Sequence, residues 1–164
     1  MPPPTPPADR ALQALSDSIG GSRTRRPEDA TDPAIPVAAT VVLMRDGAEG
    51  LEVLMIERPD RGSFAGAWVF PGGKLEDGDR LTDAEGEETV ARRAGVRETS
   101  EEIGLGIDAD ALVTLSCWDP PPGIALRIRT WFFLTPAAAG ALTLGADEAV
   151  AAEWLRPADA LARH

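Results

Sequence analysis

Three glutamates lie close together in one short stretch of the chain. Glu98, Glu101 and Glu102 occur within the sequence RETSEE at 97–102. In an α-helix, residues at positions i, i+3 and i+4 lie on one face within about one turn. Hard divalent cations such as Mg²⁺ bind through carboxylate oxygens, so this face predicts a metal site. An acidic face that only contacts solvent is the alternative, and the neighbouring sequence favours the metal site.

A glycine-containing bend precedes the glutamates, in the sequence FPGGKLEDGD at 70–79. Gly72, Gly73 and Gly78 permit positive φ angles and let a ligand approach the backbone closely. The bend and the predicted helix are therefore expected to lie side by side around a ligand.

Together the two stretches resemble the signature of the Nudix hydrolases, G-x5-E-x7-R-E-U-x-E-E-x-G-U with U aliphatic. Gly73 matches the first glycine, residues 97–102 match the R-E and E-E pairs, and residues 104–105 match the closing G-U. There are three departures. Asp79 stands where the family has its first glutamate, Thr99 replaces an aliphatic residue, and 80–96 is about ten residues longer than the corresponding family spacing.

The resemblance implies a metal-dependent enzyme. Nudix enzymes use water to cleave the diphosphate of a nucleoside diphosphate linked to another group. The implied ligands of Mg²⁺ or Mn²⁺ are Glu98, Glu101 and Glu102, because a divalent cation neutralises diphosphate oxygens and lowers the pKa of bound water. Arg97 is expected to hold a carboxylate through a bidentate pair.

Other expected site residues lie outside the acidic triplet. The implied catalytic set is Glu98, Glu101, Arg97 and Glu148, and Gly72 and Gly73 are expected near the phosphates. Glu148 is a candidate base or extra ligand, with an ordinary acid at the end of a strand as the alternative. Asp79 is either a supporting carboxylate or an ordinary turn aspartate.

The sequence also resembles one branch of the family, which hydrolyses coenzyme A and its acyl esters. Residues 66–73 fit its G-x3-F-P-G-G pattern, and Trp118, the proline loop and 127–133 resemble a later part of it. Arg58, Arg61 and Arg127 are expected to bind the remaining phosphate charge, and Trp118 to stack on a base. Surface arginines and ordinary packing are the alternatives.

Two functional classes remain open. The first is an active Nudix pyrophosphohydrolase, which retention of all three glutamates favours. The second is a catalytically weak Nudix-fold nucleotide-binding or regulatory module, which the displaced first half of the signature and the Asp79 substitution favour.

Composition excludes several other classes. A net charge of −11 argues against general nucleic-acid binding, and no apolar run approaches the roughly 20 residues of a membrane span. Cys117 is the only cysteine and His164 the only histidine, and there is no tyrosine. A general base is therefore expected to be a carboxylate or a metal-bound water, in a cytoplasmic protein.

The resemblance implies an α+β Nudix fold with a mixed β-sheet sandwiched between helices. We expect residues 1–35 to form a Pro-rich, largely disordered arm and 36–164 to form the domain. Hydrophobic patterning predicts strands at 37–44, 51–58, 67–70, 112–118, 125–134 and 148–155, with helices at 88–103 and from Pro157. The final helix looks short. Either the chain is clipped, or the arm or a second copy in a homodimer covers the sheet.

Overall fold

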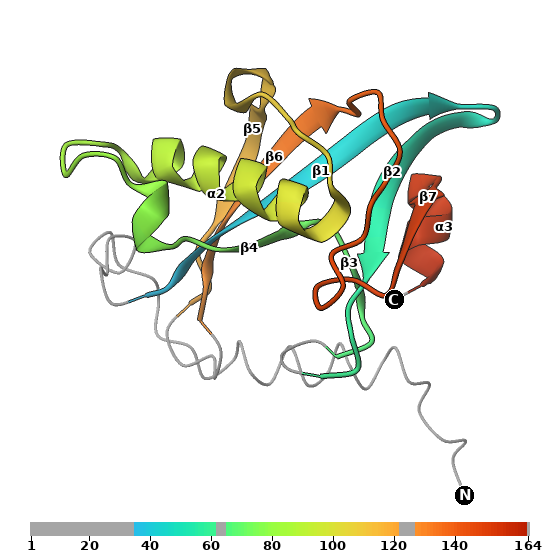
Figure 1. The fold of residues 1–164 in the computed structure, drawn as a ribbon, viewed down its shortest axis with the longest axis horizontal. Helices are drawn as coiled ribbons and strands as arrows, with labels where there is room; N and C mark the ends of the chain where they lie inside the picture. The colour runs from blue at the N-terminus through green and yellow to red at the C-terminus, as the bar shows by residue number, and fades with distance from the viewer. Residues whose placement is uncertain (1–34, 62–64, 122–126, 164) are drawn as a thin grey trace, which may run out of the picture.

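The computed structural model describes residues 35–61, 65–121 and 127–163 (Figure 1). Its strands are β1 (Val37–Gly47), β2 (Gly50–Glu57), β3 (Trp68–Val69), β4 (Gly72–Lys74), β5 (Val113–Trp118), β6 (Arg129–Pro136) and β7 (Ala151–Leu155). Its helices are α2 (Glu87–Ile103) and α3 (Pro157–Ala162), with short 3₁₀ turns η2 (Asp77–Asp79) and η3 (Ala109–Ala111).

The strands form a single mixed sheet. Its order is β3-β2-β1-β6-β5, with β4 also paired to β1 and β7 to β2. β1 and β6 run parallel, and the other pairs are antiparallel. The predicted mixed sheet is therefore confirmed.

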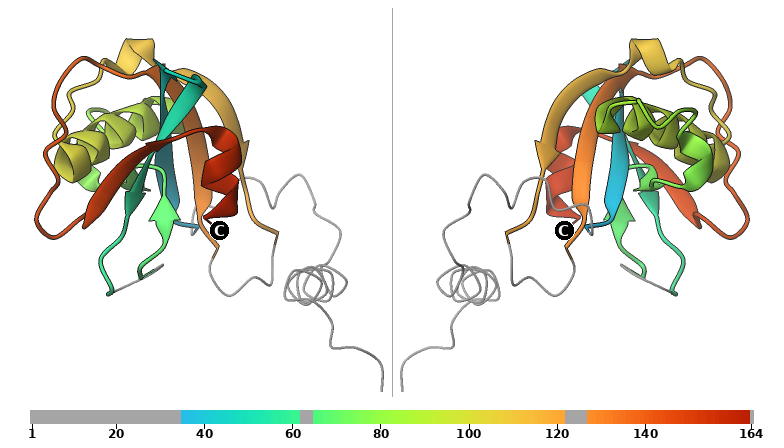
Figure 2. Two further views of the ribbon diagram at one scale, coloured as in Figure 1. Left: turned by 90° about the vertical axis from the view of Figure 1, so that its right-hand side faces the viewer. Right: turned by 90° about the vertical axis from the view of Figure 1, so that its left-hand side faces the viewer.

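Alternating side chains on the central strands divide the core into two layers. Val41 and Leu54 belong to the cluster that includes Ala94 of α2. Their neighbours Val42 and Val53 point to the opposite face, toward α3. The two helices consequently cover opposite faces of the sheet, as Figure 2 shows, and the predicted sandwich is confirmed.

Helix α2 lies close against the sheet. A Cβ atom at Gly95 would come within 2.9 Å of Val41 Cγ2, so glycine permits this approach. The helix ends at Gly104, whose φ of 71° is left-handed, and the Gly104 N–H donates to the Ser100 carbonyl. The prediction of a helix over 88–103 with a glycine cap was therefore one residue short at its start.

Other boundaries differ more. β1 and β2 extend farther into the predicted 45–50 turn, because backbone pairing continues as far as Gly47 and Gly50. The strand predicted from Glu148 starts at Ala151, after a turn. The predicted glycine bend contains β4, which pairs with β1.

The predicted arm falls almost wholly outside the described residues, which begin at Ile35, so the division at residue 35 stays a prediction. No helix in the described part of the chain is both long and apolar enough to cross a membrane.

Candidate active site

The two glycines of β4 bring its backbone close to neighbouring groups. Gly72 pairs with Thr40 of β1, and Gly73 pairs with Ala39. A Cβ atom at Gly73 would overlap the carboxylate of Glu98. Glycine at this position therefore gives the α2 carboxylate room to lie against the strand.

Glu102 is anchored to the same strand. Its side chain is only 2% exposed, and the Gly72 N–H donates to its Oε2 at 2.9 Å. Burial raises the pKa of Glu102 to about 7; nearby Glu98 and Glu148 add to the rise, while the Gly72 N–H and Arg58 oppose it. Glu102 thus combines burial, like-charged neighbours and one fixed hydrogen bond.

Glu98 lies one turn earlier on the same helix and is largely buried. Burial raises the pKa of its carboxyl group. The Arg97 guanidinium opposes that rise, while Glu101 and Glu148 reinforce it. Glu98 and Glu102 are therefore two neighbouring carboxylates for which the negative form is disfavoured.

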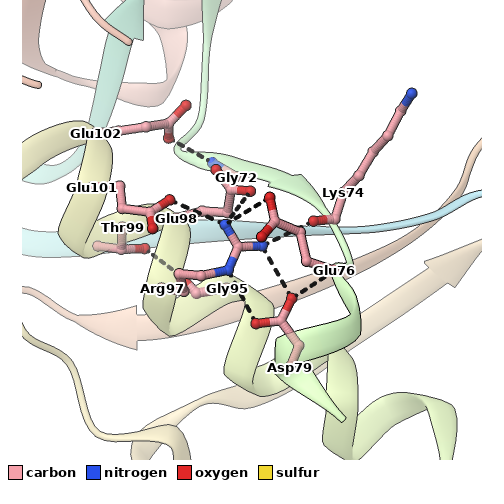
Figure 3. Close-up of polar contacts among 10 residues, drawn as sticks. All are labelled: Gly72, Lys74, Glu76, Asp79, Gly95, Arg97, Glu98, Thr99, Glu101 and Glu102. Atoms are coloured by element: carbon pink, nitrogen blue, oxygen red, sulfur yellow. Dashed lines mark hydrogen bonds and ion pairs between the residues drawn. The ribbon is translucent and has the colours of Figure 1, made fainter. Parts of the chain in front are cut away.

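Arg97 lies at the centre of the contacts drawn in Figure 3. Its Nε and Nη2 donate to the two carboxylate oxygens of Asp79, each at 3.0 Å, which is a bidentate pair. Its Nη1 donates to Glu98 at 2.9 Å and to Glu101 at 3.0 Å. Nη2 also donates to the Lys74 carbonyl at 3.0 Å.

Asp79 is buried, at 4% exposure. Besides its pair with Arg97, it accepts the Glu76 N–H at 2.8 Å. Burial opposes its charge, but these hydrogen bonds outweigh burial and lower its pKa. The side chain therefore acts in the turn and also supports Arg97, so both sequence interpretations of Asp79 describe its contacts.

The long segment between Asp79 and Arg97 folds back along α2. Residues 80–86 form a loop, and α2 begins at Glu87. Arg93 donates to the Asp79 carbonyl at 2.7 Å and pairs with Glu85 in that loop. These contacts hold Asp79 beside Arg97, although the segment between them is about ten residues longer than the usual family spacing.

The three predicted metal ligands do not share one position. Glu98 lies beside Gly73, Glu102 contacts Gly72, and Glu101 contacts Arg97 with a side chain that is 54% exposed. Within the described ranges, no three or more acidic, histidine or cysteine side chains are already grouped to hold a metal.

The chemistry of the donor set nevertheless fits a hard divalent cation, since Glu98, Glu101 and Glu102 all offer carboxylate oxygens. Two of these carboxylates, Glu98 and Glu102, have raised pKa values, and a cation would relieve the repulsion that contributes to them. Arg97 contacts Oε1 of Glu98 and Oε2 of Glu101, which leaves the other carboxylate oxygen of each residue for a cation.

Two residues from outside the signature reach this region. Glu148, on an exposed turn, contributes to the raised pKa values of both Glu98 and Glu102. Arg58 lowers the pKa of Glu102, and its buried Nε has no hydrogen-bond partner among the described residues. The structure therefore brings Glu148 and Arg58 to the acidic group.

Arg61 contacts Asp147, the residue before Glu148. Its Nη2 donates to the Asp147 carboxylate at 2.6 Å and to the Asp147 carbonyl at 3.1 Å. Sequence reasoning missed Asp147. This exposed pair joins the segment after β2 to the turn that carries Glu148.

Trp118, at the end of β5, and Arg127, just before β6, lie away from the carboxylates. Trp118 pairs with Thr130, Thr130 with Ala38 and Ala38 with Lys74. Trp118 and Lys74 are therefore separated by three inter-strand spacings of about 4.8 Å, which places them about 14 Å apart. Arg127 donates to the Pro120 carbonyl at 2.7 Å, near the end of β5. The structure does not bring these two residues to the carboxylates.

The fold and this site define a Nudix domain, and sequence comparison agrees. Residues 34–164 match the NUDIX domain family. The chain therefore belongs to that family.

Three known proteins illustrate the relationship. The chain is 32% identical over 127 residues to CTP pyrophosphohydrolase of Escherichia coli (strain K12), covering 77% of this chain and 79% of that protein. It is 33% identical over 79 residues to human adenine DNA glycosylase, covering 48% of this chain but only 13% of that protein. The structure of a NUDIX hydrolase from Alicyclobacillus acidocaldarius superimposes with a TM-score of 0.66 at 27% identity, covering 79% and 82% of the two chains.

Proposed function

We propose that this Nudix domain hydrolyses the diphosphate bond of a nucleoside diphosphate linked to another group. The prediction of a Nudix pyrophosphohydrolase agrees with the family match and with the bacterial CTP pyrophosphohydrolase. The observation that carries the proposal is the pair Glu98–Glu102, two largely buried carboxylates of raised pKa set against Gly72 and Gly73.

Each residue has a distinct part in this proposal. Arg97, fixed by its bidentate pair with Asp79, holds Glu98 and Glu101 in position. Glu148, on its exposed turn, is the candidate for taking a proton from the attacking water. Water supplies the oxygen of the new phosphorus–oxygen bond, and the bridging phosphorus–oxygen bond breaks.

Glu98, Glu101 and Glu102 would hold Mg²⁺ or Mn²⁺. When bound, the cation neutralises diphosphate oxygens and makes a water molecule more acidic. Arg58, whose Nε is buried without a partner in the described part of the chain, would bind phosphate charge beside Glu102.

For the substrate we propose coenzyme A or an acyl ester of it. The G-x3-F-P-G-G pattern at residues 66–73 supports this choice. In the structure, the last two residues of that pattern are Gly72, whose N–H donates to Glu102, and Gly73, which lies against Glu98, so the residues that resemble the coenzyme A branch adjoin the acidic group. A homodimer and a cytoplasmic location remain predictions of the sequence.

A substrate panel tests this function. Purified full-length protein is incubated with Mg²⁺ or Mn²⁺ and, in turn, with coenzyme A, an acyl-coenzyme A, ADP-ribose, NADH and a dinucleoside polyphosphate. The nucleotide products are then measured. We expect cleavage of at least one diphosphate, fastest with coenzyme A compounds, and none in EDTA. Absence of turnover across the panel would contradict the function.

The variant Glu102→Gln tests the acidic group directly. It removes one negative oxygen donor but keeps the side chain's size, so kcat should fall at least a hundredfold while the protein still folds. Steady-state kinetics and circular dichroism provide the two readouts. A fully active variant would remove Glu102 from the metal site.

One observation favours the second candidate function, a nucleotide-binding or regulatory module of low activity. Among the described residues, the acidic side chains are not already grouped for a metal, and Arg97 contacts two of them. Calorimetric binding of ADP-ribose or coenzyme A without any hydrolysis would identify this case.

A further inference from the structure

The six-residue helix α3 covers only part of its face of the sheet. It packs mainly on β2 and β7, on one side of the molecule (Figure 1). β5 forms the opposite edge of the sheet, next to β6. Among the described residues, the part of this face over β5 and the adjoining side of β6 is therefore left without a helix.

Large apolar side chains lie on this uncovered part. Val113 pairs with Leu134, and Trp118 pairs with Thr130. Leu134 packs in the α3 layer of the core. Because Thr130 lies four residues before it in the same strand, both pairs point to that face. Val113 is 61% exposed and Trp118 is 57% exposed. We call Val113, Trp118 and Leu134 the β5 face.

The β5 face has the properties of a surface that another element covers. β5 contains no charged residue, and β6 contains none after Arg129. Native proteins protect an edge strand with charges, with a strand irregularity or with a covering element. β5 has a register irregularity between Thr114 and Ser116, yet Val113 and Trp118 on either side of it stay more than half exposed. A covering element is therefore expected.

The N-terminal sequence, which lies outside the described residues, contains a segment suited to this surface. Within 8–19, helical spacing aligns four apolar residues, Ala8, Leu12, Leu15 and Ile19. Polar residues such as Gln13 fall on the other side. Pro7 before the segment and Gly20 after it are residue types favoured at the start and the end of a helix. Because so short a helix is marginal in water, its apolar face needs a surface to pack on.

The described chain begins close to the β5 face. The Pro36 carbonyl accepts the Arg129 N–H at the start of β6. Ala38 pairs with Thr130, which pairs with Trp118, so two inter-strand spacings place Ala38 about 10 Å from Trp118. Residues 20–34 span up to about 50 Å when extended. The connection is therefore long enough for 8–19 to lie on the β5 face.

We propose that residues 8–19 form an amphipathic helix that packs on the β5 face of the same molecule, with Leu12 and Leu15 against Val113 and Trp118. The tether keeps this segment at an effective concentration on the order of millimolar. A second copy is the less suitable occupant, because it carries the same net charge of −11 and is repelled. The proposed contact is independent of the hydrolytic function.

Hydrogen exchange of the full-length protein, followed by mass spectrometry, tests the contact. The amides of residues 11–19 should exchange at least tenfold more slowly than in an unstructured peptide of the same sequence. Leu15→Asp should lower this protection by at least about tenfold, since burial of one leucine shifts a docking equilibrium by that much. Gln13→Asp, on the polar side, should change it less than twofold. Unprotected amides in the unmodified protein, or equal effects of the two variants, would overturn the inference.

A second pair of variants locates the surface. Val113 is on the β5 face, and Leu81 is 70% exposed on the loop before α2. Val113→Asp should remove the protection of residues 11–19, and Leu81→Asp should leave it unchanged. Acrylamide quenching of Trp118, taken as the difference from Trp118→Phe, should at least double in Leu15→Asp. Equal effects of Val113→Asp and Leu81→Asp would refute docking on the β5 face.

Sedimentation equilibrium distinguishes the segment from a second copy of the chain. A monomer whose residues 11–19 are protected to the same extent at every protein concentration supports the inference. A dimer that Val113→Asp dissociates and Leu15→Asp leaves intact would place a second copy on the β5 face and overturn it. Protection of residues 11–19 that rises with protein concentration would mean docking between molecules, and it would overturn the inference as well.

Discussion

At Asp79, one carboxylate has contacts in two directions. It accepts hydrogen bonds from Nε and Nη2 of Arg97, and it also accepts one from the Glu76 N–H. Arg97 in turn contacts Glu98 and Glu101. The shorter aspartate therefore reaches Arg97 because the 3₁₀ turn η2 carries its backbone close to α2.

The variant Asp79→Asn should disturb this arrangement more than its small change in size suggests. It removes the bidentate negative partner of a mostly buried arginine, which keeps its contacts with Glu98 and Glu101, and breaking such a pair lowers stability. Because Arg97 is partly exposed, we expect a loss of about 1–3 kcal/mol of stability and at least a tenfold loss of kcat. Urea unfolding and steady-state kinetics measure the two effects.

Asp77→Asn is the matched control, since Asp77 is an exposed residue of the same turn. It should resemble the unmodified protein in both measurements. Equal effects of the two substitutions would show that the Arg97–Asp79 pair does not position the carboxylates.

At the level of elements, the sequence predicted those parts of the fold that depend on local patterns. The apolar runs of β1 and β2 and the glycine after Ile103 identify two strands and the end of α2 without any knowledge of distant contacts. The turn at 146–148 and the pairing of β4 with β1 were missed, because both depend on segments far apart in the chain.

The candidate site also has parts that local sequence patterns predict and parts that they do not. Spacing alone gathers Glu98 and Glu102 on one face of α2, and the structure places both beside the predicted glycines. The contacts of Glu101 and Glu98 with Arg97 depend on side-chain rotamers, which spacing does not specify. The separation of Trp118 from the carboxylates depends on strand order, which a single sequence specifies weakly.

The contact between β4 and α2 gives a prediction at this scale. Gly73→Ala places a methyl group where the Glu98 carboxylate lies, so either the helix or that side chain must shift. We expect kcat to fall at least tenfold, with a smaller change in melting temperature. Gly78→Ala is the control, because a Cβ atom at Gly78 would meet nothing within 4 Å. Unchanged kinetics in Gly73→Ala would contradict the close approach of Glu98 to β4.

For the whole molecule, the acidic group should affect stability as well as chemistry. The chain carries a net charge of −11, and the folded state holds Glu102 at a pKa of about 7, against about 4.5 for an ordinary glutamate. Between these two pH values the folded state keeps a proton that the unfolded chain releases. The free energy of unfolding in EDTA should therefore fall as pH rises from 4.5 to 7, by roughly 3 kcal/mol from this group, and then level off.

Glu102→Gln should remove most of that slope, because glutamine does not titrate. The variant should match the unmodified protein near pH 4.5 and exceed its stability above pH 7, as measured by urea unfolding at several pH values. Glu101→Gln removes the same formal charge from the same helix at a half-exposed side chain, so its curve should run parallel to that of the unmodified protein. Since the same carboxylate would bind the metal, Mg²⁺ should raise the stability of the unmodified protein above pH 7 and have a smaller effect on Glu102→Gln. Parallel curves for Glu102→Gln and the unmodified protein would mean that Glu102 is as well solvated in the folded state as in the unfolded chain, and that folding alone does not prepare this group for a cation.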